Sequence, residues 1–296
     1  MLFSCNCVCD GTHFVLHCGM LSVMWKVDPD HHGDLLDLIR FALNLTTFRE
    51  IADEARRFLG HPEQQRIALV PAKTADTRAP PSERARRLFS LGHTIDRTAA
   101  EAYLKNRGIE RFGPALRYHE AVFFRDYARQ AFGQLPAMLA SVTDCSGRLT
   151  GVARTWLDRE RDSIASIEDP KRALGQIAGN TVRFGAVGAD LMAGEGIETM
   201  LSVGSALPKM PLAACLTARH LSLFEIPPNL KTLWIARDND EAGATAARLL
   251  KAKVQTQRPE IEVIELTSFL GDFNDDLQSL GIDGLQQELM ATQGGA

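Results

Sequence analysis

The 296-residue sequence lacks any run of 18 consecutive apolar residues, so we expect no membrane-spanning helix. Its first segment has neither a basic start nor a clean small-residue cleavage site, which argues against a signal peptide and favours a cytoplasmic protein. No internal repeat recurs at a fixed period. Overall disorder is excluded because 45% of the residues are hydrophobic. These absences leave an ordinary globular chain of about two domains.

Cysteine is scarce and unevenly distributed. Four of the six cysteines, at positions 5, 7, 9 and 18, lie near the start of the chain, and the others are Cys145 and Cys215. A disulfide-rich secreted fold would be shorter and would spread its cysteines more evenly. The cluster therefore indicates a metal site, the remnant of one, or a chance grouping.

Charge is divided unequally along the chain. The net charge is −4, and residues 190–296 hold 8 Lys and Arg against 15 Asp and Glu, so the excess of acid lies in the last third. A basic first part of the chain and an acidic last part are consistent with two binding surfaces, one for a polyanion and one for cations. Solvated helix faces would explain the same balance.

Hydrophobic periodicity and turn residues divide the chain into five segments. We expect an irregular segment over residues 1–32, helices over 33–60, a linker over 61–82, a mixed α+β subdomain over 83–187 and a parallel α/β domain over 188–296. In the subdomain, helices are expected near 82–92 and 96–108. Alternation then predicts strands over 138–142 and 149–156, joined by a hairpin turn at Ser146-Gly147.

The last segment alternates between strand and helix patterns. Short apolar strands are expected near 191–193, 212–215, 230–236 and 261–266, with helices over 195–206 and 241–254. Strands separated by helices predict a parallel sheet with helices on both faces.

Acidic residues follow three of these strands. Glu195 follows the first, Asp238 and Asp240 follow the third, and the string Gly271-Asp272-Phe273-Asn274-Asp275-Asp276 follows the fourth. An open parallel sheet binds ligands outside the carboxyl ends of its strands, and carboxylates crowded there repel one another unless a cation is present. Oxygen ligands without Cys or His favour Mg²⁺ or Mn²⁺. Helix caps and turns would explain each motif taken alone.

The strings GEGIETMLS, IARDNDEAGATAA and GDFNDDL, in this order and spacing, resemble the Toprim domain of plasmid, phage and integrated-element proteins. The domain occurs in bacterial-type primases, topoisomerases and some nucleases. The resemblance implies a Toprim-type sheet over residues 188–296, with Glu195, Asp238 and Asp240 as catalytic residues. Glu195 would be the general acid/base. The metal set implied is Glu195, Asp238, Asp240, Asp272 and Asp275, with Asp276 as the alternative to Asp275.

Two positions depart from the pattern of bacterial replicative primases. An acid stands at Glu198, three residues after Glu195, where those primases place one four residues on; Thr199 occupies that position here. The late cluster has two residues between its first two aspartates rather than one. Both departures concern the ligands of a second metal ion.

The segment before the acidic domain resembles the corresponding part of primases. The strings VTDCSGRLTGVARTWLD and EDPKRALG imply that Arg154, Lys171 and Arg172 contact the nucleotide triphosphate or the template. Arginine offers phosphate a bidentate fork and lysine offers a point charge. An exposed strand position is the alternative explanation of Arg154.

Residues 96–119 resemble the stretch that links the zinc module of mobile-element primases to their core. Here Lys105, Arg107 and further arginines interleave with Tyr103, Phe112 and Tyr118. That mixture fits a groove for single-stranded nucleic acid, in which bases stack on rings and cations meet phosphates. Buried rings with solvated arginines would give the same pattern.

Primases of this kind begin with a zinc ribbon, and residues 33–60 resemble its helical tail. The spacing of Cys5, Cys7 and Cys9 is too tight for a ribbon, so we expect a degenerate remnant. Any Zn²⁺ would be held by Cys9, His13, His17 and Cys18.

These features together imply a metal-dependent DNA primase of a mobile element, which makes short primers from nucleoside triphosphates on single-stranded DNA. A Toprim-type nuclease and a non-catalytic single-stranded-DNA-binding protein are the alternatives. Because the chain has no G-x₄-G-K-[ST] sequence, any helicase would be a separate partner.

Overall fold

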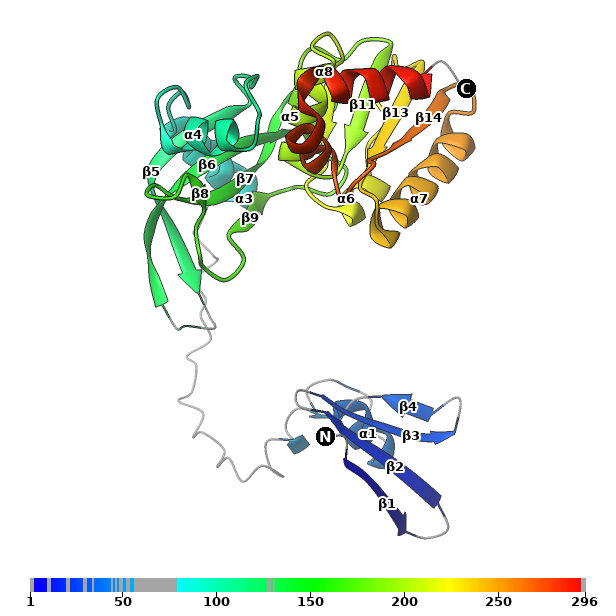
Figure 1. The fold of residues 1–296 in the computed structure, drawn as a ribbon. Helices are drawn as coiled ribbons and strands as arrows, with labels where there is room; N and C mark the ends of the chain where they lie inside the picture. The colour runs from blue at the N-terminus through cyan, green and yellow to red at the C-terminus, as the bar shows by residue number, and fades with distance from the viewer. Residues whose placement is uncertain are drawn as a thin grey trace. The chain divides into compact units, whose positions relative to one another are not determined.

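The computed structural model describes residues 3–9, 12–19, 22–28, 31–33, 35–43, 45, 47, 50–51, 54–55, 79–126, 129 and 131–293. The chain divides into two compact units, Met1–Thr77 and Arg78–Ala296, each considered by itself (Figure 1). No helix of these ranges is long and apolar enough to cross a bilayer.

The first unit contains an antiparallel sheet. Its strands, in sequence order, are β1 (Phe3–Cys9), β2 (Thr12–Gly19), β3 (Ser22–Asp28) and β4 (His31–Gly33). The expectation of an irregular segment is therefore wrong for the described part of residues 1–32. The signal overlooked is Asp10-Gly11, which separates β1 from β2 in the sequence and is a preferred hairpin dipeptide.

The expected helix after Gly33 is confirmed as α1 (Leu35–Ala42). In the second expected helix only residues 50, 51, 54 and 55 are described, and they are helical. Most of the expected linker lies outside the described residues. Of the candidate zinc ligands, Cys9 ends β1, while His13, His17 and Cys18 belong to β2. The zinc site stays a prediction.

The second unit begins with two helices and a group of strands. These are α3 (Pro81–Leu91), α4 (Ala99–Asn106), β5 (Leu116–Asp126), β6 (Ala131–Thr143), β7 (Leu149–Asp158), β8 (Ser163–Ile164), β9 (Lys171–Gly175) and β10 (Thr181–Phe184). An alternating part follows, with β11 (Asp190–Gly194), α5 (Ile197–Ala206), β12 (Leu212–Ala214), α6 (Ala218–Ser222), β13 (Thr232–Arg237), α7 (Glu241–Gln257), β14 (Glu262–Thr267) and α8 (Phe273–Gln293).

One ten-stranded sheet runs through the whole second unit. Eight of its strands follow the path β14-β13-β11-β12-β10-β6-β7-β8, while β5 pairs with β6 and β9 pairs with β7. The four strands at the β14 end are parallel, as expected. Strand β10 pairs antiparallel with both β12 and β6, so it joins the parallel part to the antiparallel part. The two expected domains therefore share a continuous backbone ladder.

Helices cover both faces of this sheet. On one face, Met138, Met192 and Ala236 share a core with residues of α4, α5 and α8. Their strand neighbours point to the opposite face, where α6 and α7 cover the parallel strands and α3 covers β6 and β7. This alternation follows from the two-residue period of a strand, and it gives each strand residue a defined face.

The expected strands and helices of this unit are found close to their predicted bounds. The sequence did not predict β5, β8, β9, β10, α6 and α8. Strand β5 has charged residues such as Arg117 and Arg125 within it, which obscure the alternation. Helix α8 is interrupted at Gly281, whose φ of 71° lies in the left-handed region, so its apolar period breaks there.

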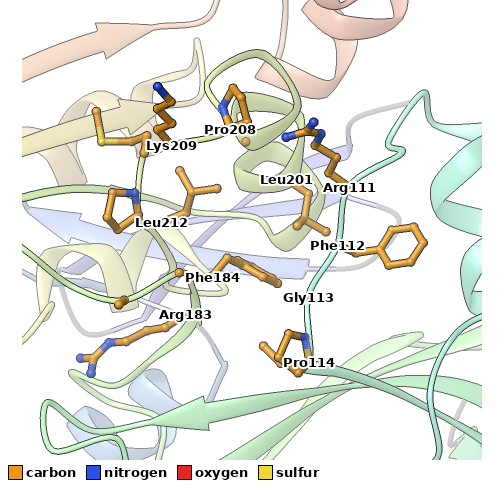
Figure 2. Close-up of a pocket in the computed structure, with 16 residues that line it drawn as sticks. Arg111, Phe112, Gly113, Pro114, Arg183, Phe184, Leu201, Pro208, Lys209 and Leu212 are labelled. Carbon is orange, nitrogen blue, oxygen red and sulfur yellow. The ribbon is translucent and has the colours of Figure 1, made fainter.

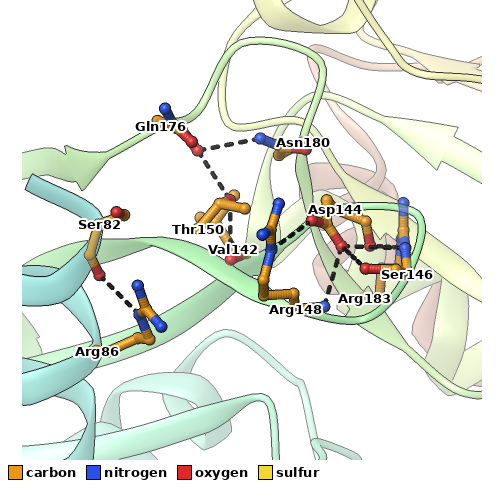
Figure 3. A network of polar contacts seen from close by, with 10 residues as sticks. All are labelled: Ser82, Arg86, Val142, Asp144, Ser146, Arg148, Thr150, Gln176, Asn180 and Arg183. Atoms are coloured by element: carbon orange, nitrogen blue, oxygen red, sulfur yellow. Dashed lines mark hydrogen bonds and ion pairs between the residues drawn. The ribbon is translucent and has the colours of Figure 1, made fainter.

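The turn between β6 and β7 falls at Ser146-Gly147, as expected, and Asp144 organises it (Figure 3). The Asp144 carboxylate accepts hydrogen bonds from the Ser146 hydroxyl at 2.6 Å and from the backbone N–H of Arg148 at 3.0 Å. Those bonds hold the pKa of Asp144 at about 2. Arg183 of β10 donates to the Asp144 carbonyl, which ties the turn to the joining strand.

Candidate active site

The candidate site lies where three neighbouring parallel strands end. Glu195 follows β11 directly, Asp238 follows β13 directly, and Asp272 follows β14 after a short loop. Because β11, β13 and β14 are adjacent and parallel, their carboxyl ends meet at one edge of the sheet. The structure therefore gathers the three acidic motifs, as the sequence predicts.

Asp238 is the most perturbed of these acids. Its pKa is raised to about 7, first by burial and then by the charges of Glu195, Asp272, Asp240 and Asp275. Its Oδ1 atom is buried and has no hydrogen-bond partner among the described residues. A buried carboxylate oxygen without a hydrogen-bond partner costs free energy, which makes this atom a candidate for binding a ligand.

Glu195 is half-buried at the end of β11. Burial and then the charge of Asp240 raise its pKa, while the backbone N–H of Ala218 partly offsets this effect. A carboxyl group whose pKa moves toward neutrality can both take up and release a proton. The geometry thus agrees with the role of general acid/base expected for Glu195.

Asp240 and Asp272 also act as helix caps. Oδ1 of Asp240 accepts a hydrogen bond of 2.6 Å from the N–H of Gly243 at the start of α7. Oδ1 of Asp272 accepts bonds from the N–H groups of Asn274 and Asp275, at 2.7 and 2.9 Å. The capping explanation therefore holds for both residues. It does not account for Glu195 or Asp238.

The two late aspartates have different environments. Asp276 is 1% exposed, and its oxygens accept hydrogen bonds from the N–H groups of Phe269 and Leu270, at 2.9 and 2.8 Å. Asp275 is exposed, and its charge acts on Asp238. The geometry thus favours Asp275 as the late member of the acidic set, while Asp276 fixes the loop after β14.

Asn239 connects the two loops that carry the aspartates. Its backbone N–H donates to the Gly271 carbonyl at 2.9 Å, and its side chain donates to the Phe269 carbonyl at 3.3 Å. These bonds fix the loop after β13 against the loop after β14. Asp238 and Asp272 are thereby held in register before any ligand binds.

Glu198 is not part of the acidic cluster. It is buried on α5, where Tyr103 donates to it at 2.7 Å and Lys171 pairs with it at 3.0 Å. Burial opposes its ionisation, but Lys171 and Tyr103 hold its pKa below the ordinary value. No sequence pattern predicts this contact, because Tyr103, Lys171 and Glu198 lie on three separate elements, α4, β9 and α5. Thr199 is buried as well.

Lys171 and Arg172, which are neighbours on β9, point to opposite faces of the sheet. Lys171 reaches Glu198 on the face covered by α4 and α5. Arg172 lies over the ring of Trp156, with 5.6 Å between its guanidinium carbon and the ring centroid. Its cross-strand partner Arg154 lies over the same ring at 5.0 Å. Lys171 and Arg172, which were both expected to contact the nucleotide or the template, thus lie in different surroundings.

Arg154 belongs to a cationic group on the face covered by α3. Burial, then the charges of Arg172 and Arg84, lower its pKa. One of its terminal nitrogens donates to the Ala173 carbonyl at 3.3 Å, while its buried Nε has no partner among the described residues. Three like charges and an unused donor favour an anion at this place. Arg84 was missed by the sequence reading.

The cations expected on α4 have protein partners. Lys105 is exposed and pairs with Glu101 at 2.8 Å. Arg107 lies 5.5 Å from the Tyr103 ring centroid and donates to the buried side chain of Asn274 on α8. Tyr103 and Tyr118 are each 2% exposed, so these two rings are core residues and not stacking surfaces. A role of Lys105 and Arg107 in nucleic acid binding stays a prediction.

No group of three or more His, Cys, Asp and Glu side chains stands ready to hold a metal ion within the described ranges. The acidic side chains nevertheless lie close enough to raise the pKa of Asp238 together. The acids lie close together without forming a preformed metal site, because Asp240 and Asp272 each turn one oxygen toward a helix N-terminus. The donors gather at one edge but are not arranged as a preformed cage.

Comparison with known proteins agrees with this description. Residues 190–283 match the family model of the Toprim domain, and residues 79–184 match a domain of unknown function, DUF7146. The chain thus carries a Toprim domain, of the class that its sheet and acidic edge define. Toprim domains generally bind divalent metal ions such as Mg²⁺.

Comparison with solved structures extends the similarity beyond the Toprim domain. The catalytic core of DnaG is 13% identical, with a TM-score of 0.50, and the match covers 72% of this chain and 78% of that one. A DNA primase domain from Pseudomonas aeruginosa (15% identity, TM-score 0.48) matches over 71% and 78% of the two chains. The E. coli primase catalytic core (12%, 0.48) matches over 72% and 79%. The match to the DnaG core shows that the second unit shares its fold with that catalytic core. No curated protein sequence matches.

Proposed function

We propose that this protein is a metal-dependent nucleotidyltransferase that makes short primers on single-stranded DNA. The observation that carries the proposal is the unpartnered, buried Asp238 oxygen. It lies beside four further carboxylates at the strand ends of a primase-like fold. Surplus carboxylates repel a nucleic acid unless a cation offsets their charge. Their presence at this edge therefore supports metal-assisted chemistry on phosphates.

The donor set fits Mg²⁺ or Mn²⁺. It consists of carboxylate oxygens, which hard divalent cations prefer. Asp238 would hold the ion through its unpartnered oxygen, together with Asp240, Asp272 and Asp275. The cap hydrogen bonds of Asp240 and Asp272 use Oδ1 and leave Oδ2 available. The ion would supply neutralisation of the charge that develops on phosphate oxygens.

Glu195 is the residue suited to proton transfer. Its raised pKa, caused by burial and by Asp240, allows it to accept the proton of an attacking ribose hydroxyl. Its position directly after β11 places it beside Asp238 on the neighbouring strand. Asn239 and Asp276 would keep the two loops fixed during this transfer.

Arg154 and Arg172 would bind phosphates of the nucleotide or the template. Both guanidinium groups lie over Trp156, and the repulsion between them falls when an anion binds. Lys171 is held by Glu198, so its contact with a substrate would require the pair to be shared with the ligand. The origin from a mobile element and a separate helicase partner stay predictions.

The test is primer synthesis on single-stranded DNA with labelled nucleotides and Mg²⁺ or Mn²⁺. Asp238→Ala/Asp240→Ala should lower product formation more than about a hundredfold, because the cation loses its ligands. The matched control is Glu262→Ala, which removes an exposed carboxylate at the opposite end of β14. Circular dichroism checks that the double variant is folded, since Asp240 also caps α7.

Two other outcomes would replace the proposal. Metal-dependent cutting of the template without nucleotide incorporation would identify a nuclease that uses the same carboxylates with water as nucleophile. DNA binding that Asp238→Ala/Asp240→Ala leaves intact, with neither synthesis nor cutting by the wild type, would identify a non-catalytic binding protein.

A further inference from the structure

A second feature of the larger unit is a pocket of about 560 Å³ at the junction between its two matched regions. One wall is residues 111–115, which precede β5. The other walls come from the end of β10 and from residues 208–212, which lead into β12. Binding pockets form preferentially at such junctions, and this volume is within their usual range.

The pocket is remote from the acidic site in the fold. Leu212, which lines it, is the first residue of β12, a strand parallel to β11. The pocket therefore opens near the amino ends of the parallel strands, whereas Glu195 and Asp238 follow their carboxyl ends. The same ligand atom cannot engage both places, so the pocket is a separate site.

The interior of the pocket is apolar and contains an aromatic ring. Figure 2 shows Phe184 and Leu201 in the interior, with Pro114 and Leu212 nearby. Phe184 belongs to β10 and is the cross-strand partner of Leu212, so the sheet fixes its position. A flat aromatic group such as a nucleobase can stack against such a ring.

The rim of the pocket is cationic. In Figure 2, Arg111 and Lys209 lie along the same side of the opening, on either side of Pro208. Both side chains are exposed, and neither forms a hydrogen bond or an ion pair with another described residue. Arg183 also lines the pocket, but it donates to the Asp144 carbonyl. None of the lining residues is acidic, although the whole chain carries a net charge of −4.

We infer that this pocket binds a nucleoside phosphate, with the base against Phe184 and the phosphate between Arg111 and Lys209. The ligand is a free nucleotide or one unit of a single strand, since both present the same chemistry. Cations without carboxylates select an anion, and the apolar interior excludes simple inorganic phosphate as the best ligand. The inference does not depend on primer synthesis.

The experiment measures binding to the full-length protein in EDTA, so that metal-dependent binding at the acidic edge is absent. The probes are a methylanthraniloyl adenine nucleotide and a fluorescein-labelled hexadeoxynucleotide, each followed by fluorescence anisotropy. Arg111→Glu/Lys209→Glu should weaken binding at least about tenfold, because both phosphate contacts become repulsive. Both residues are exposed, so the fold should be unaffected.

The matched control is Arg248→Glu/Lys251→Glu, which reverses two exposed charges on α7. It changes the net charge by the same amount and should alter affinity less than about twofold if the effect is local. A second variant, Gly113→Leu, fills the interior. A Cβ at Gly113 would meet only Phe184, at 4.0 Å, so the substitution fits the backbone and should exclude the base.

The outcomes separate the two sources and can overturn the inference. Binding of the mononucleotide would identify a free nucleotide as ligand, and binding of only the hexamer would identify a strand. The inference is wrong if the wild type binds neither probe. It is also wrong if Arg111→Glu/Lys209→Glu and Gly113→Leu bind like the wild type, or if the α7 control loses as much affinity. Failure of primer synthesis would leave each of these results interpretable.

Discussion

The Toprim domain contains two kinds of buried carboxylate that differ in their partners. Glu198 and Asp276 are fully buried, and protein donors satisfy each of them. Asp238 and Glu195 are half-buried at the strand ends, and neighbouring carboxylates raise the pKa of each: four act on Asp238, and Asp240 acts on Glu195. Protein donors offset the cost of ionising Glu198 and Asp276. Among the described residues, Oδ1 of Asp238 has no hydrogen-bond partner, whereas Glu195 accepts from the backbone N–H of Ala218.

This difference distinguishes the acids that stabilise the fold from the acids of the candidate site. A carboxylate that accepts hydrogen bonds from the protein stabilises the fold, and its removal lowers the free energy of unfolding. An unsatisfied carboxylate destabilises the ligand-free fold, and a bound cation would offset that cost. Substitutions of the two kinds should therefore change stability in opposite directions.

The largest effect is expected from Glu198→Ala. The change leaves Lys171 and the buried Tyr103 hydroxyl without their partner, which should cost about 3 kcal/mol of unfolding free energy. Urea unfolding followed by circular dichroism measures the loss. Glu198→Gln keeps a hydrogen-bond acceptor for Tyr103 and should lose less. An unchanged midpoint for Glu198→Ala would mean that the buried pair contributes nothing.

A somewhat smaller loss is expected from Asp276→Ala. The N–H groups of Phe269 and Leu270 would lose their acceptor, at a cost of about 2 kcal/mol. Hydrogen exchange at these two amides should speed up more than at the β13 amides. Asp275→Ala is the matched control, because Asp275 is exposed and should leave both stability and exchange unchanged. Equal effects of the two variants would contradict the assignment of Asp276 to the loop.

Asp238→Asn should change stability in the opposite direction and stabilise the metal-free protein. The Asp238 pKa is about 7 in the folded protein and 3.8 ordinarily, so the unfolded chain releases this proton first as pH rises. Stability without metal should therefore fall between about pH 4 and pH 7. Above pH 7 the ionised Asp238 carboxylate lowers the free energy of unfolding by about 2 kcal/mol, after allowance for solvent screening.

Thermal unfolding in EDTA at pH 8 tests this sign. Asp238→Asn should melt higher than the wild type there and equally at pH 4. Added Mg²⁺ should raise the Tm of the wild type by mass action and leave Asp238→Asn nearly unaffected. A lower Tm of the variant at pH 8 would show that Asp238 has a protein partner and is a structural acid like Glu198.

The smallest effect is expected from Lys105→Ala. Its ion pair with Glu101 is exposed and lies within one helix, so its removal should cost about 0.4 kcal/mol. If Lys105 also contacts nucleic acid, affinity for a single-stranded oligonucleotide at low salt should fall about twofold to threefold. Anisotropy titration measures this change. An unchanged affinity would assign Lys105 to the helix alone.

The sequence predicted the parallel part of the fold well because its signals are local. Short apolar strands, helical patterns and a cap residue after each strand lie within a few residues of one another. The acids at the strand ends followed directly, since parallel strands end at one edge. Strand β10 was not predicted: four residues without clear alternation carry little local signal, and its role depends on β6 and β12.

The sequence did not predict which side chains contact one another. Glu198 stood in an acidic motif, and only the approach of α4 and β9 shows that Tyr103 and Lys171 satisfy it. Lys171 and Arg172 were expected to act together, yet the pleat of β9 sends them to opposite faces. Tyr103 and Tyr118 fitted a stacking surface equally well until the sheet buried them.

The sequence by itself determined where the acids of the candidate site lie, because local strand and helix signals place Glu195, Asp238, Asp240 and the late aspartates after strands. Only the tertiary structure decided which of the buried acids lack a partner. Whether a carboxylate is satisfied depends on donors that come from distant elements, and pairing across such distances leaves no pattern within a short window of sequence.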